Sequence, residues 1–319
     1  MSGDTTKKTD ATEQAAHPRL DELLELRHST HTLGIASRHL VNAQFSGLYA
    51  SVFRGQGLNF EEVREYRRGD DIRNMDWKVT ARTTQPHLKV YREERERSVV
   101  LCVDHGPHMF FGTRNTFKIN QAAQAAALLG WAANGQHDRV GGILFGNGRT
   151  GPQHFIPSKD RRSLWRMLRE LAESSEPSDI TVDCLDQVLM RADRGAGTGA
   201  LIFVIADFNR EMAGLEKRLV QLCQKHAVVL IPVDDPSDQQ LPDMGQVLFT
   251  TPTGETFEVD TSDPAGQKSY SEQWQARREL LIKLANRLRV AVIPVSTDED
   301  VHKSLTTGLR RRAQSRAFM

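Results

Sequence analysis

Three aspartates end three similar runs of apolar residues. The runs begin at residues 99, 200 and 227, and they end at Asp104, Asp207 and Asp234. Apolar runs of this length predict strands that are buried on both faces, as in a parallel sheet. Because parallel strands end at one edge of the sheet, we expect the three carboxylates to lie along a common rim. Carboxylates gathered there would suit a hard divalent cation such as Mg²⁺.

Two other uses of these residues stay open. Asp after a strand most often caps the helix that follows, which would give the three acids a structural role. His105 and His108 follow the first strand, and with the acids they could hold a softer ion such as Zn²⁺. Against a zinc site, Pro107 restrains the loop between the two histidines, and an exposed loop histidine needs no ligand role.

The segments between the apolar runs must position these side chains. Helices are predicted over residues 119–133, 161–172, 185–192, 211–225, 270–288 and 298–305, with further strands over 139–145 and 290–295. This alternation predicts an α/β fold with a doubly wound, mostly parallel sheet, since each right-handed crossover needs a helix. Asn115 or Thr116 is expected to cap the first of these helices.

Four regions are predicted along the chain. Residues 1–18 are polar and are expected to form a disordered tail. Residues 19–98 are expected to form a helix and a charged segment packed on the sheet. Residues 99–309 form the main domain, with a hairpin inserted at about 244–260 around a turn at residues 252–254. Residues 310–319 form a basic tail.

The charged segment has an unusual composition. Residues 61–97 carry ten basic and nine acidic side chains, and a mix so balanced suits internal pairing better than a partner of one sign. We expect a structural network of bidentate ion pairs, with Trp77 as its apolar anchor. Its charged members are Arg64, Arg67, Asp70, Asp71, Arg73, Asp76 and Arg82. The alternatives are a solvated surface, whose ion pairs contribute at most about 1 kcal/mol each, and a partner-binding face.

A motif in this segment resembles a known family. Residues 69–77 read Gly-Asp-Asp-Ile-Arg-Asn-Met-Asp-Trp, and with residues 53–82 they resemble the signature of the bacterial family called domain of unknown function 58. Ala-Asp-Phe at 206–208 and Val-Asp-Asp-Pro at 233–236 fall in the same order as in that family, and the resemblance covers roughly residues 36–308. It implies a von Willebrand factor A-like domain, non-enzymatic, that acts with a MoxR-type AAA+ ATPase in assembling or maturing a client protein.

The resemblance also implies a metal site and its loss. Domains of that fold hold Mg²⁺ at a metal-ion-dependent adhesion site, through an Asp-x-Ser-x-Ser loop, a Thr from a second loop and an Asp from a third. Asp104 and Asp207 match two positions, but Gly106 and His108 replace the serines and Asp183 stands at the threonine position. With these hydroxyls missing, we expect weak or absent Mg²⁺ binding and no other cofactor. The expected partner-binding rim consists of Asp104, His105, His108, Asp183 and Asp207.

Composition narrows the remaining function classes. A net charge of +1 gives no overall attraction to nucleic acid or to an anionic membrane. Three widely spaced cysteines argue against a disulfide framework and predict a reducing, cytoplasmic location. No signal peptide or transmembrane segment is predicted.

Two alternatives to the adaptor function remain. One is a metal-dependent hydrolase that uses the strand-end aspartates, and the other is a nucleic-acid-binding protein that uses the arginine-rich segments.

Overall fold

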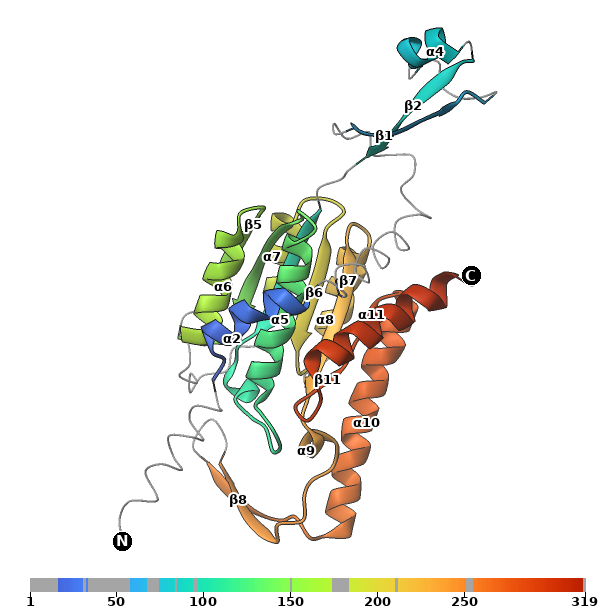
Figure 1. Ribbon diagram of the computed structural model, residues 1–319. Helices are drawn as coiled ribbons and strands as arrows, with labels where there is room; N and C mark the ends of the chain where they lie inside the picture. The colour runs from blue at the N-terminus through green and yellow to red at the C-terminus, as the bar shows by residue number, and fades with distance from the viewer. Residues whose placement is uncertain are drawn as a thin grey trace. The chain divides into compact units, whose positions relative to one another are not determined.

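The computed structural model describes most of the chain (Figure 1). The described residues are 17–30, 33, 58–67, 75–83, 85–93, 97–149, 151–173, 184–209, 212–250 and 255–317. The chain divides into two compact units, one of residues 1–45 with 97–319 and one of residues 46–96.

The larger unit is built around a seven-stranded sheet. Its strands are β3 (Ser98–Asp104), β4 (Arg139–Phe145), β5 (Gln153–Ser158), β6 (Leu201–Ala206), β7 (Ala227–Asp234), β10 (Ala291–Val292) and β11 (Val295–Ser296). The order is β10-β7-β6-β3-β4-β5, with β11 also on β7, and only β5 is antiparallel to its neighbour. The predicted mostly parallel, doubly wound sheet is confirmed. The strand order reverses between β3 and β6, and at such a point the sheet opens a crevice at the strands' carboxyl ends.

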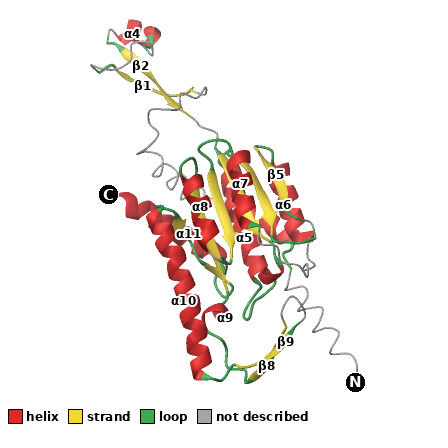
Figure 2. Ribbon diagram, turned by 180° about the vertical axis from the view of Figure 1, so that it is seen from behind, coloured by secondary structure: helices red, strands yellow, loops and turns green. Residues whose placement is uncertain are grey.

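Helices cover both faces of this sheet (Figure 2). Successive side chains of β3 point to opposite faces, so Leu101 packs into one apolar core and Cys102 into the other. The first core contains side chains of α2 (Leu20–Glu25), α5 (Lys118–Asn134), α6 (Arg161–Glu173) and α11 (Val301–Ala317). The second contains side chains of α7 (Leu185–Gly195), α8 (Met212–Cys223) and α10 (Pro264–Arg287).

Several predicted boundaries were wrong. Helix α2 and the 3₁₀ helix η1 (Leu26–Ser29) belong with the main unit rather than with the charged segment, because Leu23 is buried in the first core and its carbonyl accepts a hydrogen bond from Trp131 Nε1 at 3.0 Å. Helix α11 runs on to Ala317, so the basic residues after 309 continue a helix. Pro294 lacks a donor, and the predicted last strand is split around it into β10 and β11. The N-cap of α5 is Phe117, without a side-chain cap from Asn115 or Thr116.

The smaller unit contains a hairpin and a short helix. Strands β1 (Leu58–Glu65) and β2 (His87–Glu93) pair antiparallel as a two-stranded sheet of their own. Asp76 begins helix α4 (Trp77–Thr83) by accepting hydrogen bonds from the backbone N–H groups of Lys78 and Val79 at 3.0 and 3.1 Å. Trp77 is 68% exposed, and its role as the apolar anchor of the charged segment stays a prediction.

The ion-pair network stays a prediction. Asp70, Asp71 and Arg73 lie outside the described residues. Arg64 donates to the carbonyl of Glu65 at 3.1 Å, while Arg82 is exposed on α4.

The predicted inserted hairpin is confirmed. It consists of β8 (Gln246–Thr250) and β9 (Thr256–Asp260), paired antiparallel, and the predicted turn at 252–254 lies outside the described residues. Within the described part of the chain, no helix has the length and apolar character needed to cross a membrane.

Close packing of β4 on β3 provides a test of the sheet. A Cβ at Gly142 would lie 2.3 Å from the carbonyl oxygen of Leu101 and 2.6 Å from Met167 Sδ. We expect Gly142→Ala to lower the free energy of unfolding by about 1 to 3 kcal/mol, measured by urea denaturation. The control is Gly214→Ala in α8, where nothing lies within 4 Å of the added Cβ and alanine should stabilise the helix by up to about 1 kcal/mol. Equal effects of the two changes would contradict this packing.

Candidate functional site

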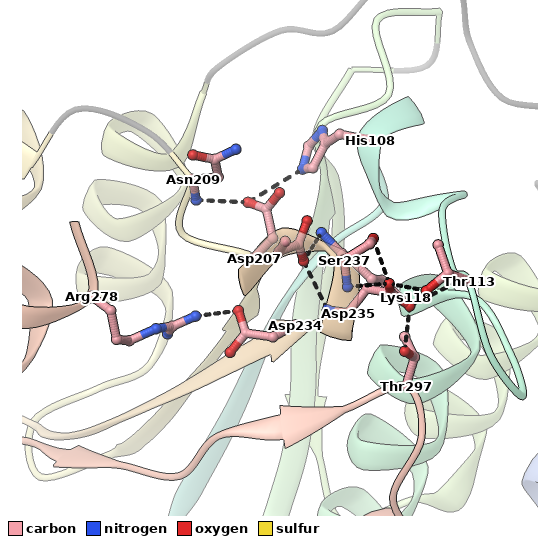
Figure 3. Close-up of polar contacts among 11 residues, drawn as sticks. His108, Thr113, Lys118, Asp207, Asn209, Asp234, Asp235, Ser237, Arg278 and Thr297 are labelled. Atoms are coloured by element: carbon pink, nitrogen blue, oxygen red, sulfur yellow. Dashed lines mark hydrogen bonds and ion pairs between the residues drawn. The ribbon is translucent and has the colours of Figure 1, made fainter. Parts of the chain in front are cut away.

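The carboxyl ends of β3 and β6 bring Asp104 and Asp207 together, as predicted. His108 Nε2 lies 3.1 Å from Asp104 Oδ2. It also lies 3.8 Å from Asp207 Oδ1, the contact drawn in Figure 3. Asp104 is fully buried and Asp207 is 9% exposed, whereas the His108 side chain is 28% exposed. These three residues, called the rim below, are the only group of three or more His, Cys, Asp or Glu side chains in the described residues that is close enough to share a metal ion.

Local backbone hydrogen bonds fix both aspartates. Asp104 Oδ1 accepts from the N–H of Gly106, and Asp207 Oδ1 accepts from the N–H of Asn209, each at 3.0 Å. Each acid therefore closes a turn two residues ahead, and neither caps a helix. The expectation that these acids cap the following helices was wrong for both.

Two glycines leave room for this loop. A Cβ on Gly106 would lie 2.5 Å from His108 Cε1, and one on Gly146 would lie 2.5 Å from Asp104 Oδ1. Gly146 also has a φ of 95°, in the left-handed region that favours glycine. Pro107 starts the short helix η3 (Pro107–Met109), which directs His108 back over Asp104. A serine at position 106 would therefore collide with the imidazole.

Asp234, at the end of β7, faces α10 instead of the rim histidine. It accepts a hydrogen bond from Arg278 (Figure 3). The Arg278 guanidinium also stacks over Trp274 at 5.1 Å. Burial raises the pKa of Asp234 to about 6, an effect that Arg278 opposes and that the nearby charges of Asp238 and Asp207 increase. Asp234 thus lies within electrostatic reach of Asp207 but is committed to a structural ion pair.

Asp235, which sequence reasoning did not select, is the most heavily hydrogen-bonded acid of this region. Its carboxylate accepts from the backbone N–H groups of Thr113 and Ser237 at 2.8 and 2.9 Å. It also accepts from the hydroxyl groups of Thr113, Ser237 and Thr297 at 2.5, 2.6 and 2.5 Å. Burial alone would raise the pKa of Asp235, but these hydrogen bonds hold it well below its usual range.

The role of Asp235 is structural. It forms a capping box with Asp238 at the start of α9 (Pro236–Gln239), and Asp238 pairs with the buried Lys118 of α5 at 2.6 Å. The network ties α5, α9 and the end of β11 together behind the rim (Figure 3). The sequence signal was present, because Asp-Pro-Ser-Asp combines an N-cap, a proline at the first helical position and an acid at the third.

His105 does not belong to the rim, and that prediction was wrong. It is 3% exposed, its backbone N–H donates to the Phe145 carbonyl at 2.6 Å, and its ring packs edge-on against Phe110 at 5.5 Å. Burial lowers the pKa of its imidazole and so favours the neutral form. Asp183, the other predicted rim residue, lies outside the described residues.

The donor set fits Mg²⁺ poorly. Mg²⁺ prefers an octahedron of oxygen ligands, whereas the rim offers two carboxylates and one imidazole, with glycine at 106 where a hydroxyl would be needed. The hydrogen bond from His108 also satisfies Asp104 without a cation. Two carboxylates and an imidazole are closer to the preference of Zn²⁺.

Calorimetry with Mg²⁺ tests this assignment. We expect no Mg²⁺ binding heat from the wild-type chain, and a gain of binding in the double variant Gly106→Ser, His108→Ser, which supplies two hydroxyl ligands and removes the imidazole that blocks position 106. Gly106→Ser alone is the control, since its added Cβ would meet the His108 ring at 2.5 Å. Tight Mg²⁺ binding by the wild-type chain would refute the expectation.

The pH dependence of stability tests the environment of Asp234. Its pKa of about 6 in the folded chain exceeds the ordinary 3.8, so between these values the folded chain holds a proton that the unfolded chain has lost. This stabilising contribution is complete below about pH 4 and is lost as the pH rises through about 6. Relative to Asp234→Asn, the wild-type chain should lose on the order of 3 kcal/mol of unfolding free energy from about pH 4 to about pH 7. A difference that stays constant across this range, measured by urea denaturation, would contradict the assignment.

Comparison with known proteins gives relatives whose own functions are not described. The chain is 28% identical over 280 residues to the uncharacterized proteins Mb1516 of Mycobacterium bovis and Rv1480 of Mycobacterium tuberculosis, with 86% of each chain covered. Among solved structures, it is similar to the conserved hypothetical protein BatB from Bacteroides thetaiotaomicron (TM-score 0.46, 15% identity, 68% of this chain and 99% of that one). It is also similar to a von Willebrand factor type A from Catenulispora acidiphila (TM-score 0.36, 12% identity, 69% of this chain and 42% of that one).

The model of one protein family matches most of the chain. The match spans residues 62–280, from β1 in the smaller unit to α10 in the larger. The predicted membership is thereby confirmed: the chain belongs to the family described as protein of unknown function DUF58.

Proposed function

We propose that this protein is a non-enzymatic interaction module, an adaptor or co-chaperone that acts with a MoxR-type AAA+ ATPase in assembling or maturing a client protein. The observation that carries the proposal is the rim itself. Its two carboxylates lie at the switch point of the sheet, where a ligand is expected, but an imidazole occupies the space of the hydroxyl ligands. In this proposal the rim is a degenerate metal-ion-dependent adhesion site that retains its two carboxylates and its position at the switch point of the sheet.

The geometry favours a cationic group on the partner. Asp207 is the more accessible of the two carboxylates, and His108 shields Asp104 from solvent. In an intact adhesion site the metal bridges the domain to an acidic side chain of its partner. Without the metal, a lysine or arginine of the ATPase can pair directly with Asp207, and an arginine would do so with two parallel hydrogen bonds.

The environment of the rim supports docking at a fixed geometry. The Asp235 hydrogen bonds and the Lys118–Asp238 pair hold the loop at Thr113, helix α9 and the end of β11 in one arrangement. A surface that is already ordered loses little conformational entropy on binding. The rim is therefore suited to recognise one partner geometry.

A metal-dependent hydrolase remains the second candidate, because the rim groups three ligating side chains whose donor atoms lie within 4.8 Å of one another. Three protein ligands with an open position for water is the arrangement of catalytic zinc sites. Turnover of a phosphoester in the presence of Zn²⁺, lost in Asp207→Asn, would favour this candidate over the adaptor.

Binding of the purified MoxR-type ATPase from the same organism tests the adaptor role. We expect Asp207→Asn to weaken the affinity about tenfold, because it removes the charge that the partner pairs with. The amide oxygen can still accept the Asn209 N–H hydrogen bond, so the fold should survive. Biolayer interferometry with the full chain gives the affinity.

The matched control is Asp193→Asn. Asp193 lies near the end of α7 and pairs with His226, which immediately precedes β7, so the same change of charge falls at the opposite edge of the sheet. The control should bind the ATPase like the wild-type chain. No binding by the wild-type chain, or equal losses in both variants, would remove the rim from the proposal.

A further inference from the structure

The hairpin of β8 and β9 forms a sheet of its own. Each strand is paired with the other and with no third strand among the described residues (Figure 2). Its two outer edges thus present backbone N–H and C=O groups that can pair with another strand. An isolated two-stranded hairpin is marginally stable in water, and a third strand would add to its stability.

The base of the hairpin is firmly held. Thr261, which follows β9, is 1% exposed, and its hydroxyl donates to the carbonyl of Gly245 at 2.7 Å and accepts from the N–H of Met244 at 2.9 Å. Gln267 of α10 donates to the Thr261 carbonyl at 2.7 Å. The strands therefore leave the main unit in a defined direction, although their own side chains are largely exposed.

The two faces of the hairpin differ in chemistry. In the observed register Val247 lies opposite Val259 and Phe249 opposite Phe257, so these four share one face, with the phenyl rings stacked at 6.0 Å. Phe257 is nevertheless 50% exposed. Glu258 and Asp260 point to the other face.

The hairpin and its base are uniformly acidic. From residue 243 to residue 263 the chain contains no Lys or Arg and five acids, all exposed: Asp243, Glu255, Glu258, Asp260 and Asp263. Along β9 the apolar side chains of Phe257 and Val259 alternate with the acids Glu258 and Asp260, whereas β8 carries no charged residue. Of the two strands of the hairpin, β9 is therefore the one whose side chains alternate between apolar and acidic.

We infer that the outer edge of β9 receives an extended segment of a partner protein as a third strand, in which apolar side chains alternate with Lys or Arg. Apolar residues of that segment would extend the face of Phe257 and Val259, and its cations would lie beside Glu258 and Asp260. Favourable cross-strand pairs of both kinds contribute about 0.2 to 1 kcal/mol each, and the backbone hydrogen bonds supply the rest of the affinity.

The same charges argue against two other occupants. If β9 paired with β9 of a second copy, acids of one chain would lie near acids of the other, and like charges opposite each other destabilise a strand pair. An anionic bilayer would repel the five acids in the same way. Of these three occupants, the strand that alternates apolar and cationic side chains is the one that would pair favourably with both faces of β9.

Fluorescence anisotropy of a labelled short peptide of alternating valine and lysine, added to the full chain, tests the inference. We expect saturable binding that weakens with salt. A peptide of alternating valine and glutamate should not bind, nor should the valine–lysine peptide with N-methyl groups that block strand pairing. Hydrogen exchange should show the amides of residues 256–260 slowed by the peptide. Equal binding of the N-methylated peptide, or slowing only at β5, an edge strand of the main sheet, would overturn it.

Matched variants locate the charge contribution. Glu258→Gln with Asp260→Asn should weaken peptide binding about fivefold, whereas Glu272→Gln with Glu279→Gln, two exposed acids of α10, should leave it unchanged. Asp207→Asn should also leave it unchanged, which separates this surface from the rim. An equal loss in Asp207→Asn would place the peptide at the rim and refute the hairpin site. Dimerisation of the wild-type chain that Phe257→Ser abolishes, or its flotation with phosphatidylglycerol vesicles, would identify one of the other two occupants and refute it as well.

Discussion

β3 and β6 pair in parallel from Val99 opposite Leu201 to Val103 opposite Ile205. Because both strands run the same way and are buried on both faces, their next acids, Asp104 and Asp207, must emerge at the same edge. The chain crosses the sheet in opposite directions after these two strands, so no crossover helix fills the space above them. The rim and the loop that carries His108 both depend on this pairing.

Four acids near that edge have different roles because their surroundings differ. Asp235 accepts hydrogen bonds from three residues and stays ionised, so it can hold the loop at Thr113, helix α9 and the end of β11 in place. Asp234 is buried with one guanidinium and is more easily protonated. Asp104 and Asp207 share one imidazole, and Asp207 keeps contact with solvent. The acids whose hydrogen bonds are satisfied within the chain stabilise the fold. Asp207, the more exposed of the two rim carboxylates, is the acid that we propose for binding another protein.

The rim lies at the carboxyl edge of the sheet, and the hairpin also begins from this edge, since it follows β7 and α9 in the chain. The rim and the hairpin would recognise different chemical groups on a binding partner. A single carboxylate in a rigid loop selects a point charge at a defined position, whereas a strand edge recognises an extended backbone and reads side chains in alternation. The proposed adaptor would use one such surface for the ATPase and the other for the client.

The sequence by itself determined the strands, because unbroken runs such as residues 227–234 have enough apolar surface to be buried on both faces whatever lies around them. It also determined the family, through the motif at residues 69–77, and the meeting of Asp104 with Asp207, which follows from parallel pairing. Only the tertiary structure decided which neighbouring histidine joins them: the strand's alternation turns His105 into the core, while η3 carries His108 back over Asp104. It likewise decided that Asp235 rather than Asp234 collects the hydroxyl groups, because Thr113 and Thr297, 122 and 62 residues away in the chain, meet it only after folding. Local patterns record burial and turn chemistry, but the partners of a polar side chain depend on contacts between distant segments.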